Sequence, residues 1–247
     1  MTREFPTGNY RFIPAVFQYS SGAAANPDYE IERVRFDGMP SLAEGFAQIA
    51  KYIQAAGRPL TSFCACELRS PGAFTEDGFL KFNQHYVKTL AEWGLFDGTV
   101  NPVARSNVCP EIDPPAEPSF YAFSFTRPSQ SATPTFVIAG GAESREGSGS
   151  YPERTVRFRD LSPEGLKEKV SFTVGSMESR LGAFGFGWKD TTAVQAYTVH
   201  DFHPVMADQL VRRGAMRSGL TWHFARPPVI DLEYEMDCRR VMRETVI

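Results

Sequence analysis

The chain has 247 residues, a formal net charge of −3 and 42 % hydrophobic residues. That length suits one large domain or two of about 100–150 residues, with enough apolar side chains for a sizeable core. The sequence has no block of basic residues and no stretch near the ~20 apolar residues of a membrane span, so we expect neither a nucleic-acid nor a membrane partner. The N-terminus has no apolar run of a secretion signal, and 4 irregularly spaced cysteines do not match a disulfide framework. We therefore expect a reduced, cytoplasmic setting.

The first half of the chain predicts strands and helices in alternation. Ser41 is a suitable N-cap for a helix over residues 41–57, in which apolar residues recur on one stripe and Gly57 marks the end. A second helix is expected over residues 75–93. Five strands are expected in this half, over residues 15–22, around 34–36, over 60–68, after Arg105-Ser106, and over 119–126.

The second half repeats this order of elements. Phe136 repeats Phe17, Val156-Arg157-Phe158 repeats Val34-Arg35-Phe36, and Arg217-Ser218 repeats Arg105-Ser106. A recurrence in fixed order indicates duplication. The expected elements are strands over residues 135–141, around 156–158, over 191–199, 220–224 and 229–236, with helices over 163–184 and near 204–213.

We therefore predict an α+β fold made of two tandem β-β-α-β-α-β-β repeats, residues 1–128 and 129–247. A linker rich in Pro, Ser and Thr joins them. Each repeat would form a sheet with two helices on one face. The other face would be apolar and covered by the sister repeat or by another chain.

The last predicted strand, residues 229–236, carries the main catalytic candidate. Its residues alternate between a charged set that includes Asp231, Glu233 and Glu235 and an apolar set, which predicts one charged and one apolar face. If Arg217 lies at the same end of the neighbouring strand, it could bind an anionic substrate while Glu233 handles a proton or a water. Alone, both residues read as solvated surface groups, but the recurrence of Arg-Ser favours a site.

Other polar clusters carry less chemistry. His200 and His203 could form a two-histidine metal site, but a solvated loop is the better interpretation because no carboxylate or cysteine completes a ligand set. Cys64 and Cys66 are expected to be buried thiols. The glycine-rich stretch 140–150 lacks the Gly-Lys-Ser/Thr ending of a phosphate-binding loop and is expected to be a hairpin loop. We therefore expect no metal site.

Two segments resemble the hallmarks of the reactive intermediate deaminase (RidA, YjgF-like) family. That family has a small residue followed by Arg-Ser, and later a strand with a hydrophobic residue followed by Glu. Ala104-Arg105-Ser106 and Met216-Arg217-Ser218 match the first hallmark, and Leu232-Glu233 matches the second. The helix with Asn83 resembles the second helix of the family. Among two-copy relatives of this length, the chain resembles the 2-aminomuconate deaminases, the 2-amino-5-chloromuconate type included.

The resemblance implies a hydrolase that converts an enamine or imine carboxylate to a ketone and ammonia without a metal or an organic cofactor, in the degradation of aromatic compounds. It implies catalytic roles for Glu233 and Arg217. Family sites lie between neighbouring subunits, so it also implies a homo-oligomer, such as a trimer of two-repeat chains. Residues implied in substrate binding are Arg105, Asn83, Ser218 and Gly141.

The sequence also departs from the family pattern. Residues 119–126 hold no acid, so the first half lacks the glutamate, and the short second helix of the second half lacks the asparagine. Two alternatives stay open. The chain could bind a small carboxylate or a partner chain without catalysis. It could also be a chorismatase-like hydrolase, although chorismatases are longer.

Overall fold

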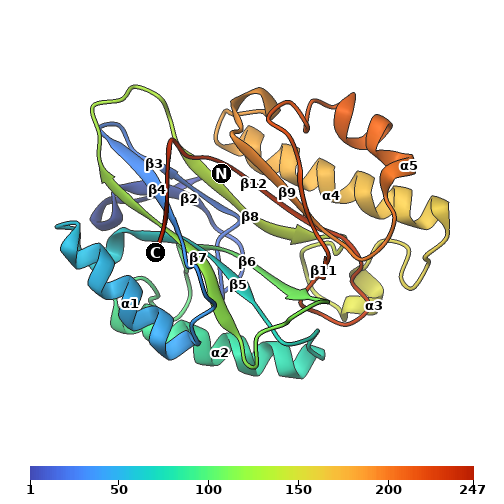
Figure 1. Ribbon diagram of the computed structural model, residues 1–247, viewed down its shortest axis with the longest axis horizontal. Coiled ribbons are helices and arrows are strands. Elements are labelled where there is room, and N and C mark those ends of the chain that lie inside the picture. Colours follow the sequence, from blue (N-terminus) through green and yellow to red (C-terminus); the bar gives the residue numbers. More distant parts are fainter.

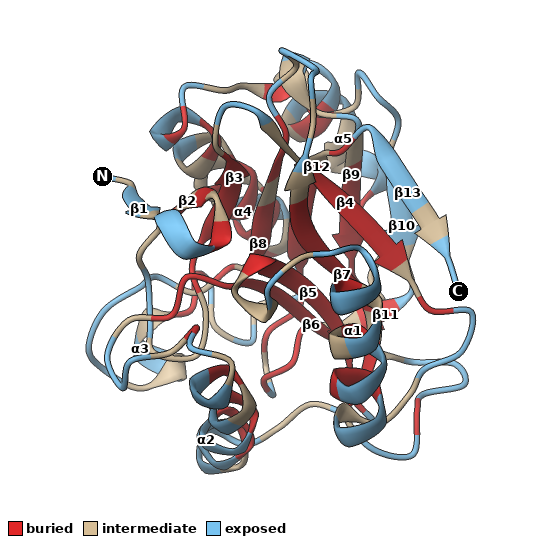
Figure 2. Ribbon diagram, turned by 90° about the vertical axis from the view of Figure 1, so that its left-hand side faces the viewer, coloured by how far each residue is buried: buried red, intermediate tan, exposed pale blue.

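The computed structural model describes residues 1–247 and has mixed α+β architecture, which confirms the predicted fold class. Two sheets pack against each other, and helices cover the outer face of each sheet (Figure 1). Strands of both sheets are mostly buried, whereas the helices expose their outer sides (Figure 2). The six-stranded sheet has the order β11-β6-β5-β7-β4-β13, with β4 (Tyr29–Arg35), β5 (Phe63–Arg69), β6 (Ala104–Pro110), β7 (Ser119–Pro128), β11 (Ala225–Arg226) and β13 (Arg243–Val246).

The second sheet has seven strands and takes members from both halves of the chain. Its order is β1-β2-β3-β8-β12-β9-β10. Its strands are β1 (Arg3–Phe5), β2 (Tyr10–Ile13), β3 (Gly22–Ala25), β8 (Phe136–Ala142), β9 (Ala193–Tyr197), β10 (Thr221–His223) and β12 (Glu235–Arg240).

The three long helices lie where the sequence predicts them. Ser41 caps the first through a reciprocal pair of hydrogen bonds with Glu44, and Thr75 and Ser162 cap the other two. The helix predicted near 204–213 is a short α-helix followed by a π-helical turn, Ala207–Val211. The helices are α1 (Leu42–Ala55), α2 (Glu76–Glu92), α3 (Tyr151–Arg154), α4 (Pro163–Ala183) and α5 (His203–Met206).

Apolar side chains attach these helices to the sheets. Phe46 of α1 and Tyr86 of α2 belong to one buried cluster with Phe120 of β7, and Met177 of α4 belongs to another with Met236 of β12. Burying one such side chain contributes about 1.5–3 kcal/mol relative to leaving it exposed. These contacts place α2 and α4 on opposite outer sides of the paired sheets.

The inner strand order is the same in both halves. The run β4-β7-β5-β6 has antiparallel, antiparallel and parallel neighbours, and so has β8-β12-β9-β10. The outer strands are exchanged between the halves, because β3 pairs with β8 and β13 pairs with β4. The exchange ties the halves together, and the boundary at residue 128 stays a prediction.

Two predicted strands are turns in the structure. Within residues 15–22 the backbone N–H of Tyr19 donates to the carbonyl of Val16 at 3.3 Å, and strand β3 begins only at Gly22. Around residues 156–158, Arg157 and Arg159 have φ values of 50° and 57°, which an extended strand does not allow. The strand of the second half that corresponds to β4 is therefore β8, and not residues 156–158.

The predicted strand over residues 229–236 is also wrong in its bounds. Asp231 has a φ of 69° and lies in a turn. The carboxylate of Glu143 then accepts the backbone N–H groups of Glu233 at 2.7 Å and Tyr234 at 3.1 Å. Those two N–H groups are thereby withdrawn from a strand ladder, and β12 begins at Glu235 instead of residue 229.

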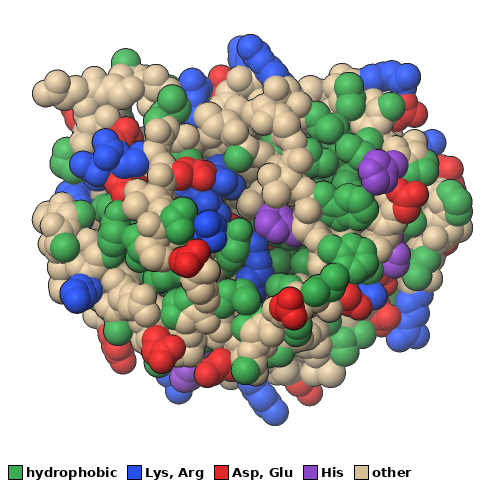
Figure 3. All heavy atoms as spheres, viewed as in Figure 1, with side chains coloured by type: hydrophobic (Ala, Val, Ile, Leu, Met, Phe, Trp, Pro, Cys, Tyr) green, Lys and Arg blue, Asp and Glu red, His purple; other side chains and the backbone are tan.

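Polar side chains, which the prediction of an apolar inner face did not include, join the two sheets. Ser106 on β6 donates across the sheets to the carboxylate of Asp237 on β12 at 2.7 Å, and Tyr197 on β9, in the same sheet as β12, donates to that carboxylate at 2.8 Å. On the face that Figure 3 shows, acidic and basic side chains are interspersed, and basic and histidine side chains line a hollow near its middle. No helix has both the length and the apolar composition that crossing a membrane requires.

Candidate active site

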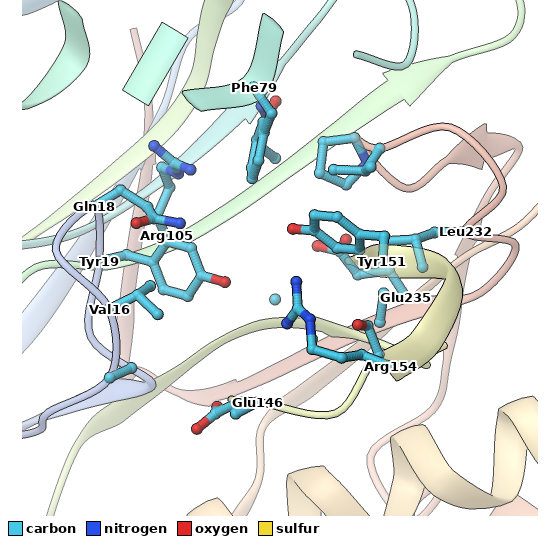
Figure 4. A pocket seen from close by; sticks show the side chains of 18 of the residues that line it. Val16, Gln18, Tyr19, Phe79, Arg105, Glu146, Tyr151, Arg154, Leu232 and Glu235 are labelled. Carbon is cyan, nitrogen blue, oxygen red and sulfur yellow. The ribbon is translucent and has the colours of Figure 1, made fainter. Parts of the chain in front are cut away.

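A cavity of about 220 Å³ lies where the two halves of the chain meet. The first half contributes the turn before β3, helix α2 and strand β6. The second half contributes strand β8, the glycine-rich segment after it, helices α3 and α4, and the start of β12. Figure 4 shows side chains from both halves facing one another across the space, with Tyr19 and Arg105 opposite Tyr151 and Glu235.

Arg105 is a buried cation with a free hydrogen-bond donor. Strand β6 holds it with only 3 % of its surface exposed. Its Nη2 donates to the Asn83 side-chain oxygen at 2.7 Å, and its guanidinium lies 4.8 Å from the Tyr86 ring centre and 5.2 Å from that of Tyr19. Nη1 has no hydrogen-bond partner. An unpaired, buried guanidinium nitrogen beside a cavity is suited to binding a carboxylate.

Glu235 is a buried carboxyl group on the opposite side of the cavity. It is the first residue of β12 and is 4 % exposed, and its carboxyl oxygens make no hydrogen bond or ion pair with another residue. Burial and the nearby Asp237 carboxylate raise the pKa of Glu235 to about 8, although Arg180 and Arg105 act against the rise. The group is therefore mostly protonated at neutral pH and can donate a proton.

Two glycines of β8 allow close approach beside Glu235, Gly140 to strand β6 of the other sheet and Gly141 to helix α4. A Cβ atom on Gly140 would overlap the Glu235 Oε1 atom and would lie 3.0 Å from Ser106 Cα. A Cβ atom on Gly141 would lie 2.9 Å from both Arg180 Nη1 and Met177 Cε. Gly140 is therefore required for Glu235 to occupy its present place.

The cavity carries an excess of positive charge. Its ionisable lining comprises four arginines (Arg105, Arg145, Arg154 and Arg180), two glutamates (Glu146 and Glu235) and two tyrosines. Because Glu235 is mostly neutral near pH 7, the arginines outnumber the carboxylates further. Burial raises the pKa of Tyr151 to about 12 and also raises the pKa of Tyr19, so both hydroxyl groups stay protonated. Such a lining attracts small anions.

Three of the predicted site residues meet at this cavity. Arg105 and Gly141 line it, and Asn83 holds the Arg105 guanidinium from helix α2. Arg217 and Ser218 lie elsewhere, exposed in the turn after the π-helical segment. Strand β10 starts only at Thr221, so this second Arg-Ser pair lies outside the sheet. The substrate-binding roles of all these residues stay predictions.

Glu233 also lies outside the cavity lining. Its Oε2 atom lies 2.6 Å from His200 Nε2 and 3.6 Å from Arg226 Nη1. Glu233 and Arg217 therefore do not share this cavity, and their catalytic roles stay predictions. The residue that faces Arg105 is Glu235, two positions further along the same Leu-Glu-Tyr-Glu segment.

Sequence reasoning missed Glu235, Tyr19, Arg154 and Arg180. Glu235 was within reach, because it stands on the same predicted strand face as Glu233, but the match of Leu232-Glu233 to the family hallmark favoured the other acid. The cavity-facing orientation of Arg180 and Arg154 had no signal in the pattern. No group of three or more His, Cys, Asp or Glu side chains is placed to hold a metal ion.

The chain matches a protein-family model described as 2-aminomuconate deaminase CnbZ over residues 2–245. The chain belongs to this family. It is 54 % identical over 245 residues to the 2-amino-5-chloromuconate deaminase of Comamonas testosteroni. The matched region covers 98 % of each of the two chains. The resemblance to the 2-aminomuconate deaminases found in the sequence is thereby confirmed.

Two solved structures of low sequence identity match this member of the CnbZ family. A chorismatase structure matches 89 % of this chain and 77 % of its own, with a TM-score of 0.50 and 13 % identity. The YjgF gene product of E. coli matches 44 % of this chain and 81 % of its own, with a TM-score of 0.33 and 16 % identity. At such identities the likeness to chorismatase concerns the fold alone.

Proposed function

We propose that this chain deaminates 2-aminomuconate or a chlorinated analogue by hydrolysis, releasing ammonia during the degradation of aromatic compounds. The observation that carries the proposal is the pairing, across one cavity, of a protonated Glu235 with an Arg105 that has a free Nη1 donor. Each half of the chain supplies one of the two groups. Membership of the CnbZ family and the name of the Comamonas relative support the substrate class.

Arg105 binds the substrate carboxylate next to the amino-bearing carbon. Its Nη1 is free, and Asn83 fixes the plane of the guanidinium through Nη2. A charge-assisted hydrogen bond to a carboxylate contributes about 1.5–3 kcal/mol. Because the aromatic rings of Tyr19 and Tyr86 flank the cation, the carboxylate is held with little water around it.

Glu235 moves the protons of the reaction. As an acid it protonates the carbon end of the enamine, and the C–N bond becomes an iminium double bond. As a carboxylate it then takes a proton from the water that attacks the iminium carbon. The amino alcohol so formed loses ammonia, the C–N bond breaks, and a ketone remains, so one water is consumed for each ammonia released. A positioned acid and base of this kind contributes about 10²- to 10⁴-fold.

The decisive experiment mixes purified protein with 2-aminomuconate and, separately, with its chlorinated analogue. We expect one equivalent of ammonia for each substrate consumed, and oxygen from ¹⁸O-labelled water in the ketone product. Substrate that binds without releasing ammonia would contradict the proposal and support a non-catalytic binding protein. Ammonia release without the oxygen label would contradict the hydrolytic route alone, once exchange of the ketone oxygen with solvent is controlled.

A further inference from the structure

One of the four arginines of the cavity is already paired with a carboxylate of the protein. Arg180 Nη2 donates to Glu146 Oε1 at 3.3 Å, whereas Arg105, Arg145 and Arg154 form no ion pair with any residue. Nη1 of Arg180 donates to the carbonyls of Ala139 and Gly140, which fixes the guanidinium against strand β8. Arg180 therefore presents one nitrogen to a carboxylate from a rigid position.

The two partners of this ion pair differ strongly in exposure. The Arg180 side chain is 11 % exposed and the Glu146 side chain 65 %. Ser21 Oγ adds a second, weaker donor to the same Glu146 oxygen at 3.5 Å. An exposed carboxylate loses little when it returns to water, whereas a nearly buried guanidinium needs an anion. The place beside Arg180 Nη2 therefore favours a carboxylate, and a carboxylate other than that of Glu146 can fill it.

The segment that carries Glu146 is rich in glycine and borders a second hollow. Gly147 and Gly149 have φ values of 132° and 106°, which side chains with a Cβ atom rarely adopt. Glu146 and Arg180 also line a second hollow on their other side, which includes Ser171 and Phe172. Glu146 can therefore swing away from Arg180 without leaving a neighbouring space.

We propose that Arg180, assisted by Ser21, binds the second carboxylate of a dicarboxylic substrate, and that Glu146 occupies this place until the substrate displaces it. The inference rests on the proposed function in taking the substrate to be a dicarboxylate. Arg105 and Arg180 then select for an anion with a carboxylate at each end. Exchange of one carboxylate for another leaves the charge balance at Arg180 unchanged.

Two unreactive six-carbon dienes test the inference without any turnover. Muconate has a carboxylate at both ends, and sorbate has one. Calorimetry should show that the wild type binds muconate more tightly than sorbate. Arg180→Gln should weaken muconate binding about tenfold or more while changing sorbate binding less than about twofold. Glu146→Gln should tighten muconate binding by about threefold or more, because no internal carboxylate competes for the place.

Arg213→Gln is a matched control. Arg213 forms an ion pair with Glu178 on α4, the helix that also carries Arg180, but it does not line the cavity. It should leave the muconate preference intact. Arg180→Lys keeps a cation and should retain part of the preference, which separates charge from folding defects. The inference fails if Arg180→Gln weakens both ligands equally, if Glu146→Gln weakens muconate, or if the wild type does not prefer muconate. Binding with the expected pattern but without ammonia release from 2-aminomuconate would refute only the proposed function.

Discussion

The two Arg-Ser pairs of this chain have the same sequence and opposite environments. Arg105 and Ser106 lie in β6 and are each 3 % exposed, while Arg217 and Ser218 lie in an exposed turn. Strand β6 is flanked by β5 and β11. Strand β10 is an edge strand, and it begins at Thr221, after Arg217-Ser218 in the sequence. Two glutamates of one segment also have different environments, since Glu235 faces the cavity and Glu233 faces His200. A short motif thus becomes a site only where a sheet encloses it.

The strongest test of this comparison exchanges the two acids separately. Glu235→Gln keeps the shape of the side chain but removes the transferable proton, so the turnover number for 2-aminomuconate should fall about 10²- to 10⁴-fold. Glu233→Gln should stay near the wild type. Steady-state rates of ammonia release measure both variants. If Glu233→Gln were the slow enzyme, the acid of the motif and not the acid of the cavity would do the chemistry.

The two arginines provide the next test. Arg105→Lys keeps the charge but loses the planar fork and the geometry set by Asn83, so kcat/KM should fall about 10- to 100-fold, mostly through KM. Arg217→Lys should change neither constant. Circular dichroism and melting curves check that both variants fold. Equal losses in the two variants would mean that the exposed pair also reaches the substrate.

The glycines of β8 test whether the close approach of the halves matters. Gly140→Ala should displace Glu235 and Ser106 and lower kcat/KM about tenfold, short of the ~10²-fold cost of a full 1 Å misplacement. Gly141→Ala meets only the side-chain ends of Arg180 and Met177, and neither Glu235 nor a backbone atom, so it should cost less. A larger loss in Gly141→Ala would place the sensitive contact at Arg180 instead.

The smallest expected effect is a pH dependence. The pKa of Glu235 is raised from the usual 4.5 to about 8, so the acid form is present below that pH and is lost as the pH rises through it. If proton donation limits the reaction, kcat/KM should be roughly half its plateau value at about pH 8 and fall further above it. Glu233→Gln should keep this profile. A rate that increases through pH 8 would show that the carboxylate form is needed first.

Local sequence was sufficient for the helices and for one side of the cavity. The helices α1, α2 and α4 follow from apolar stripes and capping residues, which depend on neighbours within a few positions. The recurring Arg-Ser pair singled out Arg105, and the structure places it in a buried strand beside the cavity, while its role in substrate binding stays a prediction.

Other features were decided only by the tertiary structure, because they depend on partners far along the chain. Glu143 binds the backbone of Glu233, 90 residues away, just before β12 begins, and Glu233 pairs with His200 while Glu235 lines the cavity. The exchange of β3 and β13 between the sheets left no trace in the alternation of residues. The raised pKa of Glu235 likewise arises from burial between elements of both halves. The sequence by itself thus determined the family and the order of the inner strands and helices along the chain, and it singled out Arg105 as a candidate. The contact between the halves decided which acid faces that arginine.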